Sequence, residues 1–128
     1  MIGYATLGSN DIDKALGFYD TLFAAVGGKR LMQMPDERKL TFYGAGAGKP
    51  MLAIGKPYDG AAATHGNGTM VALAADTREQ VDQIYAKAIE LGGGDEGAPG
   101  TRGPDAMGFY GAYFRDLDGN KFCAFKMG

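Results

Sequence analysis

The chain uses one pattern twice: a strand-like segment followed by an amphipathic helix, repeated at an offset of about 66 residues. The first copy opens with Tyr-Ala-Thr-Leu at residues 4–7, and its helix ends at Gly27 and Gly28. The second copy opens with Met-Val-Ala-Leu at residues 70–73, and its helix ends at Gly92 and Gly93. A duplicated unit constrains the fold, because both copies must form the same supersecondary structure and equivalent residues then occupy equivalent positions.

The helix of each copy is predicted from the i, i+3, i+4 spacing of its apolar residues. These residues are Ile12, Ala15, Leu16, Tyr19, Leu22, Phe23 and Val26 in the first copy, and Val81, Ile84, Tyr85, Ala88 and Leu91 in the second. We expect Asn10 to cap the first helix by accepting a hydrogen bond from an early helical N–H, with Asp11 and Asp13 at the positive end of the helix dipole. Thr77 and Gln80 have the spacing of a capping box at the second helix.

Three further short strands are expected after each helix. They span residues 29–34, 39–43 and 50–54 in the first copy, and about 95–98, 109–114 and 121–127 in the second. Asp118 and Gly119 predict a hairpin between the last two strands, and residues 99–108 are expected to form a loop. Each half is then β, α, β, β, β. One helix covers only one face of such a sheet, so the other face requires the sister half or a ligand.

Size and charge exclude several classes of protein. With 128 residues, the chain is expected to form a single domain, with a first module at about 1–56, a joint at about 57–68 and a second module at about 69–128. The net charge of −2 and the scattered basic residues predict no nucleic-acid partner. We expect no membrane partner and no signal peptide, because no apolar run approaches the ~20 residues of a membrane span. The single cysteine, Cys123, agrees with a cytoplasmic location.

Two motifs carry a family resemblance. The segment NDIDKALGFYD at residues 10–20 resembles the first strand-to-helix signature of the vicinal oxygen chelate superfamily, the glyoxalase, bleomycin-resistance and extradiol dioxygenase group. The segment RDLDGNKF at residues 115–122 resembles the superfamily's C-terminal DPDGN hairpin. With the paired βαβββ order, the resemblance covers essentially the whole chain. It implies an α+β domain of the glyoxalase/bleomycin-resistance type, whose mixed sheets curve around a cavity that a homodimer often completes.

The resemblance also identifies where a metal would bind. The superfamily's metal enzymes take ligands from the first and last strands of each half, and the matching positions here hold Tyr4, Ala53, Met70 and Cys123. None is the His or Glu of the metal enzymes, and a site with two histidines is impossible by count, because His65 is the only histidine. Its glycine-rich surroundings are typical of a solvated loop. We therefore expect no cofactor, with a divalent metal only in the alternative function below.

The predicted ligand-binding residues are Tyr4, Ala53, Met70, Arg102, Tyr110 and Cys123. Tyr4 and Met70 are expected on the cavity side of their strands if the helices cover the other faces. The alternatives are a core aromatic residue for Tyr4 and plain apolar filling for Met70. Cys123 is either a nucleophile or redox site, or a buried structural residue, which is the commoner role of an unpaired cysteine.

Arg102 lies in the predicted loop, and Tyr110 lies in the predicted strand that follows it. Arg102 can grip a carboxylate or phosphate from a glycine-flanked loop at the cavity mouth, or it can be a solvated surface residue. Tyr110 and Tyr113 lie on opposite faces of one strand, so at most one of them faces the cavity.

These features predict a glyoxalase-like protein that binds a small hydrophobic or aromatic-bearing molecule in a metal-free, largely apolar cavity, most simply as a homodimer. The alternative is a lyase or isomerase of glyoxalase type, similar to lactoylglutathione lyase, with unusual or absent metal ligands or with Tyr4 and Cys123 as acid and base groups. A third interpretation is a structural or regulatory dimer. The sequence leaves open whether the protein is an enzyme.

Overall fold

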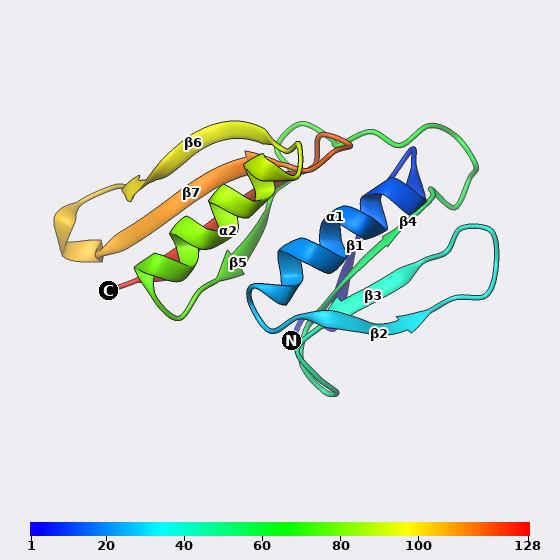
Figure 1. Ribbon diagram of the computed structural model, residues 1–128, viewed down its shortest axis with the longest axis horizontal. Coiled ribbons are helices and arrows are strands. Elements are labelled where there is room, and N and C mark those ends of the chain that lie inside the picture. The colour runs from blue at the N-terminus through cyan, green and yellow to red at the C-terminus, as the bar shows by residue number, and fades with distance from the viewer.

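Each half of the chain forms a four-stranded sheet with one helix in the computed structural model, which describes residues 1–128 (Figure 1). The first half contains β1 (Tyr4–Gly8), α1 (Ile12–Ala24), β2 (Lys29–Gln33), β3 (Thr41–Gly44) and β4 (Met51–Gly55). The second contains β5 (Val71–Ala74), α2 (Arg78–Glu90), β6 (Gly94–Thr101), the short 3-10 helix η1 (Asp105–Met107), β7 (Phe109–Arg115) and β8 (Lys121–Met127). The predicted α+β fold of two βαβββ modules is confirmed.

The two sheets have the same topology. The strand order is β1-β4-β3-β2 in the first sheet and β5-β8-β7-β6 in the second, and in each sheet the first strand runs parallel to the last while the other pairs are antiparallel. Thr6 pairs with Ala53 in the first sheet, and Ala72 pairs with Cys123 in the second. The duplication therefore extends to individual strand pairs.

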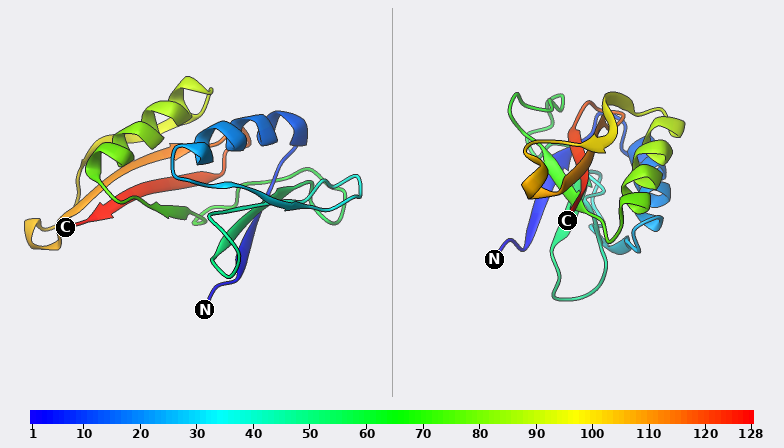
Figure 2. Two further views of the ribbon diagram at one scale, coloured as in Figure 1. Left: turned by 60° about the horizontal axis from the view of Figure 1, so that its bottom comes forward. Right: turned by 90° about the vertical axis from the view of Figure 1, so that its left-hand side faces the viewer.

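Both helices lie on one side of the two sheets, so the opposite face of each sheet carries no helix (Figure 2). The core fills the space between the helices and the sheets. Its most deeply buried large side chains include Tyr19, Leu22, Tyr43, Ile54, Ile84, Phe114 and Phe122. Strand alternation decides which residues face away from the helices: Leu7 is buried in the core, whereas Tyr4 and Thr6 are exposed on what we call the open face of the first sheet.

The hairpin of residues 116–120 connects the second module to the first through hydrogen bonds. The side-chain amide of Asn120 donates to the backbone carbonyl of Gly8 at 3.1 Å, and the carboxylate of Asp118 accepts from the backbone N–H of Asn10 at 2.8 Å. Asp116 is buried and accepts hydrogen bonds from the backbone N–H groups of Asp118 and Asn120 at 2.9 and 2.8 Å. The resemblance motif in this hairpin therefore has a structural role.

The cap of α1 differs from the prediction. Asp11 caps the helix, since its carboxylate accepts from the backbone N–H of Lys14 at 3.3 Å. Asn10 bonds instead to Ala63 in the joint, accepting from its N–H at 2.7 Å and donating to its carbonyl at 3.2 Å. The prediction for Asn10 was wrong because a partner distant in sequence, which no local pattern reveals, binds its side chain.

In the second module, Thr77 caps α2 as predicted, accepting from the N–H of Gln80 at 3.1 Å. The predicted loop at residues 99–108 is shorter than expected, because β6 continues through Pro99 to Thr101. Proline is tolerated there because β6 is an edge strand. No helix of the fold has the length and apolarity needed to cross a membrane.

Candidate functional site

Tyr4 and Ala53 lie on the open face of the first sheet, on the neighbouring strands β1 and β4. The Tyr4 ring packs edge-on against Phe42, with the ring centres 5.0 Å apart, and Tyr4 remains 55% exposed. Ala53 pairs with Thr6 and Phe42 and is buried. Neither β1 nor β4 contains a charged residue, so these two strands offer a ligand mainly apolar surface and hydroxyl groups.

Met70 and Cys123 belong to the second module. Met70 immediately precedes β5 and is 45% exposed, whereas Cys123 is only 2% exposed and sits between Ala72 and Tyr113 on the open face. Burial raises the pKa of the Cys123 thiol, against opposing effects of Tyr113 and two nearby cations. The thiol is therefore protonated at neutral pH, as expected of a structural cysteine.

An apolar groove of about 600 Å³ lies between the two modules. Residues of β1 and β5, each an edge strand of its sheet, contribute to its lining. Ala5 and Met51 contribute to its first-module side, and Met70 and Ala72 to its second-module side. Of its 16 lining residues, 13 are hydrophobic, so the groove can hold an uncharged organic group but offers few hydrogen bonds. Of the predicted site residues, only Met70 lines it.

A polar cluster lies toward the opposite edge of the second sheet, on the open face. Around the ring of Tyr113, the guanidinium carbon of Arg102 lies 5.6 Å and the ammonium nitrogen of Lys121 lies 5.7 Å from the ring centre. Arg102 donates hydrogen bonds to the backbone carbonyls of Ala98 at 2.6 Å and Thr101 at 3.4 Å. Neither cation takes part in a salt bridge within the chain.

Tyr110 lies on the helix side of β7, because its hydroxyl donates to Asp82 of α2 at 2.6 Å. Tyr113 is therefore the tyrosine of this strand that occupies the open face. The structure thus brings Arg102 and Cys123 together around Tyr113, and it places Tyr110 on the other side of the sheet.

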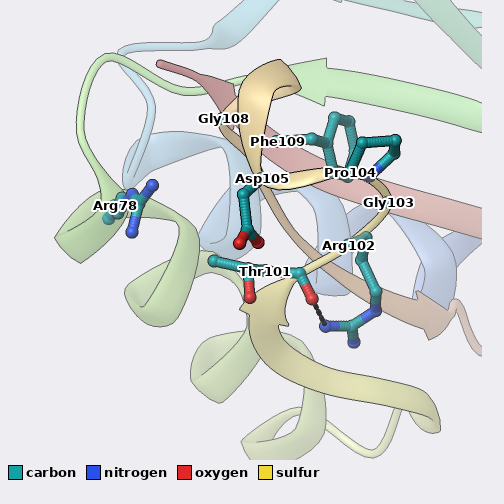
Figure 3. Close-up of a pocket in the computed structure, with 8 residues that line it drawn as sticks. All are labelled: Arg78, Thr101, Arg102, Gly103, Pro104, Asp105, Gly108 and Phe109. Carbon is teal, nitrogen blue, oxygen red and sulfur yellow. Dashed lines mark hydrogen bonds between the residues drawn. The ribbon is translucent and has the colours of Figure 1, made fainter.

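A smaller cavity of about 210 Å³ lies where the end of β6 meets η1 and the start of α2 (Figure 3). Figure 3 shows the carboxylate of Asp105 extending toward Thr101, with Arg78 of α2 on another side and the Arg102 guanidinium turned back to the Thr101 carbonyl. Only one of its eight lining residues is hydrophobic, so this cavity offers polar contacts, in contrast to the groove.

The sequence matches the model of the Glyoxalase/Bleomycin resistance protein/Dioxygenase superfamily over residues 1–124. The chain belongs to this superfamily. Among solved members, a glyoxalase/bleomycin resistance protein from Albidiferax ferrireducens T118 is 35% identical, and the match covers 98% of each chain with a TM-score of 0.85. The superfamily membership predicted from the two motifs is confirmed.

More distant solved structures share the fold. A glyoxalase/bleomycin resistance protein/dioxygenase family enzyme from Burkholderia phytofirmans PsJN is 21% identical, with 98% of each chain covered and a TM-score of 0.75. A structure named lactoylglutathione lyase, from Agrobacterium tumefaciens, is 23% identical, with 98% of this chain and 92% of that chain covered and a TM-score of 0.65. No functionally curated protein matches the sequence.

The metal of the superfamily's metal enzymes does not fit the donors at the matching positions. Ala53 has no donor atom, the thioether of Met70 suits soft ions, and burial keeps the thiol of Cys123 protonated. Tyr4 alone is an unusual ligand, and no three His, Cys, Asp or Glu side chains are grouped to hold an ion. His65 is exposed in the joint, with Nδ1 3.0 Å from the Gly66 carbonyl oxygen. These positions therefore do not supply a ligand set for a divalent metal.

The position of Lys121 beside Tyr113 was not predicted from the sequence, and Tyr113 was left as one of two candidates. The signal that reveals both is the hairpin at Asp118, because residues equally distant from the turn pair across it. This pairing places Tyr113 opposite Cys123 and Arg115 opposite Lys121, all on one face. No local sequence pattern predicts the groove, because the groove depends on how the two modules pack against each other.

Proposed function

We propose that this protein binds a small molecule with a hydrophobic or aromatic body in a metal-free, largely apolar cavity. The observation that carries the proposal is the chemistry at the superfamily's metal positions. Tyr4, Ala53, Met70 and Cys123 replace the metal ligands there, and the two exposed residues, Tyr4 and Met70, supply surface for apolar contact. Such surfaces with a few polar groups are typical of ligand pockets.

The groove between the modules and the adjoining open face of the second sheet form the proposed binding region. Ala72 and Ala74 of β5 line the groove, and both are exposed. Their small side chains leave space above the strand, and an aromatic ring that covers them gains about 25 cal/mol for each Å² of apolar surface removed from water.

We further propose that two copies of the chain associate, with the open faces turned inward. Tyr4, Met32 and Met70 are exposed large apolar residues, and Tyr4 and Met32 lie on or beside the open face of the first sheet. Covering them stabilises an association between copies. Analytical ultracentrifugation at increasing protein concentration tests this, and a single monomeric species at the highest concentration would contradict it.

The binding proposal is tested with 2-naphthamide, a neutral aromatic probe. The chain has no tryptophan, so naphthyl fluorescence can be excited without a tryptophan background. We expect saturable binding and an increase in thermal stability, because a ligand that binds the native state raises its stability. Ala72→Phe should weaken binding roughly tenfold or more, because the added ring occupies the space of the probe. Ala62→Phe, at an exposed position in the joint, is the matched control. Absence of binding, or equal binding by both variants, rejects the proposal.

A lyase of glyoxalase type is the second candidate function, since the fold is shared with a structure named lactoylglutathione lyase. Turnover of a hemithioacetal by chelator-treated protein would support a metal-free lyase, and loss of turnover on chelation would support a metal-dependent one. The protonated, buried Cys123 is a poor base, which places this function behind simple binding.

A further inference from the structure

We propose that the open face of the second sheet contains an anion subsite, in which Arg102, Lys121 and Tyr113 bind the carboxylate or phosphate group of an aromatic ligand. The aromatic body of the ligand lies over Ala72, beside the buried Cys123, toward the groove. This inference rests on the proposed function, because it assigns a chemical class to the ligand of the same cavity.

The strand register supports this arrangement. Ala72, Cys123, Tyr113 and Gly97 pair in succession, so one residue from each strand forms a continuous row across the sheet on its open face. Neighbouring strands lie about 4.8 Å apart, so the distance from Ala72 to Tyr113 is roughly 10 Å. The row is apolar at its β5 end and cationic toward its β6 end. A bicyclic aromatic acid has matching polarity and a similar length.

Glycines of β6 make room for the Arg102 side chain. A Cβ atom on Gly100 would lie 2.9 Å from Nη1 of Arg102, and a Cβ atom on Gly97 would lie 3.2 Å from Nη2. The pairing of β6 with β7 shifts register on both sides of Gly97, which curves the strand at this point. The guanidinium therefore lies over bare backbone, close to Tyr113.

The guanidinium is held in place but not saturated with hydrogen bonds. Its bonds to the carbonyls of Ala98 and Thr101 use two of the five N–H donors, which leaves three for a ligand. A guanidinium fixed in this way loses little side-chain freedom when it binds a carboxylate or phosphate, and its planar fork matches either group.

The surrounding charges leave this face positive. Glu96 is close enough to Lys121 to feel its charge, but it is paired with Arg115 at 2.6 Å, and its pKa is lowered mainly by Arg115, with a smaller effect from Lys121. Its negative charge is thereby balanced by Arg115, so Arg102 and Lys121 remain without an acidic partner in the chain. The whole chain carries a net charge of −2, so this local excess of positive charge is not a general property of its surface.

The experiment compares three probes of one shape: neutral 2-naphthamide, 2-naphthoate and 2-naphthyl phosphate. Binding is followed by naphthyl fluorescence anisotropy at neutral pH and low salt. We expect at least one anion to bind roughly tenfold or more tightly than the amide, the size of effect typical of charged hydrogen bonds. The tighter of the two anions identifies the head group that the subsite prefers.

Amino-acid substitutions test which residues cause the preference for the anionic probes. Arg102→Gln and Lys121→Gln should each reduce the preference for the anion severalfold while changing the affinity for the amide less than about twofold. Lys14→Gln removes an exposed cation on α1 and should leave the preference unchanged. Gly100→Ala keeps every charge but displaces the guanidinium, and it should also reduce the preference. Circular dichroism and the retained amide affinity show that each variant is folded.

The outcomes separate the two proposals. If the amide binds and neither anion binds more tightly, the anion subsite is rejected and the binding function stands. If no probe binds, the proposed function itself fails. A preference that persists in the Arg102→Gln, Lys121→Gln double variant, or that falls equally in Lys14→Gln, also rejects the subsite, because it would then reflect diffuse charge.

Discussion

The hydroxyl of Tyr19 in α1 donates a hydrogen bond to the carboxylate of Asp116 in the hairpin between β7 and β8. Both residues are buried, and they lie 97 positions apart in the sequence. The carboxylate of Asp116 also accepts from the backbone N–H groups of Asp118 and Asn120. One buried carboxylate therefore joins the helix of the first module to the turn of the second.

Replacing Tyr19 with Phe should lower the free energy of unfolding by about 1–3 kcal/mol, because the buried carboxylate loses one donor. Urea denaturation followed by circular dichroism measures the change. Tyr85→Phe is the control, since the Tyr85 hydroxyl donates to Asp95 at 2.8 Å on an exposed part of the surface. That variant should change stability by less than about 0.5 kcal/mol. Equal losses of unfolding free energy in the two variants would show that the buried hydrogen bond stabilises the protein no more than the exposed one.

Stability should fall at high pH. Burial and the neighbouring Asp116 raise the pKa of Tyr19 well above its ordinary value, and burial and Asp20 raise that of Tyr43. A raised pKa means that the folded state holds the proton more tightly, so its contribution is complete below the unfolded pKa of about 10 and is lost as pH rises beyond it. The urea midpoint should decline between about pH 9 and pH 11, and less steeply in Tyr19→Phe. A midpoint that is constant over this range would contradict the expectation.

Cys123 should react slowly with alkylating reagents. It is 2% exposed, and burial raises the pKa of its thiol, so both access and the fraction of reactive thiolate are reduced. We expect iodoacetamide at pH 8 to modify the native protein at least about tenfold more slowly than the urea-unfolded chain, as measured by mass spectrometry. Similar rates in the two states would identify an exposed, activated thiol and would reopen the nucleophile interpretation.

Replacement by alanine should have opposite effects on stability at two of the glycines. Gly17 is exposed within α1 and has open space at its Cβ position, so Gly17→Ala should stabilise the protein by about 0.5–1 kcal/mol through helix propensity. A Cβ atom on Gly93 would lie 2.6 Å from the Arg115 carbonyl oxygen and 2.7 Å from that of Ala88. Gly93→Ala should therefore destabilise the protein by about 1–3 kcal/mol, since both neighbours are backbone atoms. Thermal melting of the two variants tests the pair, and a shift in the same direction for both would refute it.

Local patterns predicted the elements well. The apolar spacing of α1 and α2, the Thr77 cap and the hairpin at Asp118 and Gly119 all act within a few residues, and all are present in the structure. The prediction that Asn10 caps α1 failed because its partner is not local: Ala63 is 53 positions away. The extension of β6 through Pro99 was missed because an edge strand tolerates a residue that local rules assign to a loop.

The candidate site was predictable in part. The family resemblance predicted Tyr4, Ala53, Met70 and Cys123 at the first and last strands of the two modules. Tyr4, Ala53 and Cys123 lie on β1, β4 and β8, and Met70 immediately precedes β5. The cluster around Tyr113 was harder to predict. The Arg102 side chain comes close to Tyr113 where the backbone of β6 is irregular, and no local pattern predicts this irregularity. The groove depends on the packing of one module against the other, which no strand or helix pattern records.

The irregularity of β6 also affects how copies of this chain can meet. This strand forms the outer edge of the second sheet, its ladder with β7 is interrupted twice, and Pro99 has no N–H to offer. An edge of this kind is a poor template for a strand from another molecule, which protects it from open-ended polymerisation. The same glycine-rich backbone that makes room for Arg102 therefore also makes this edge unsuited to pairing with a strand of another molecule.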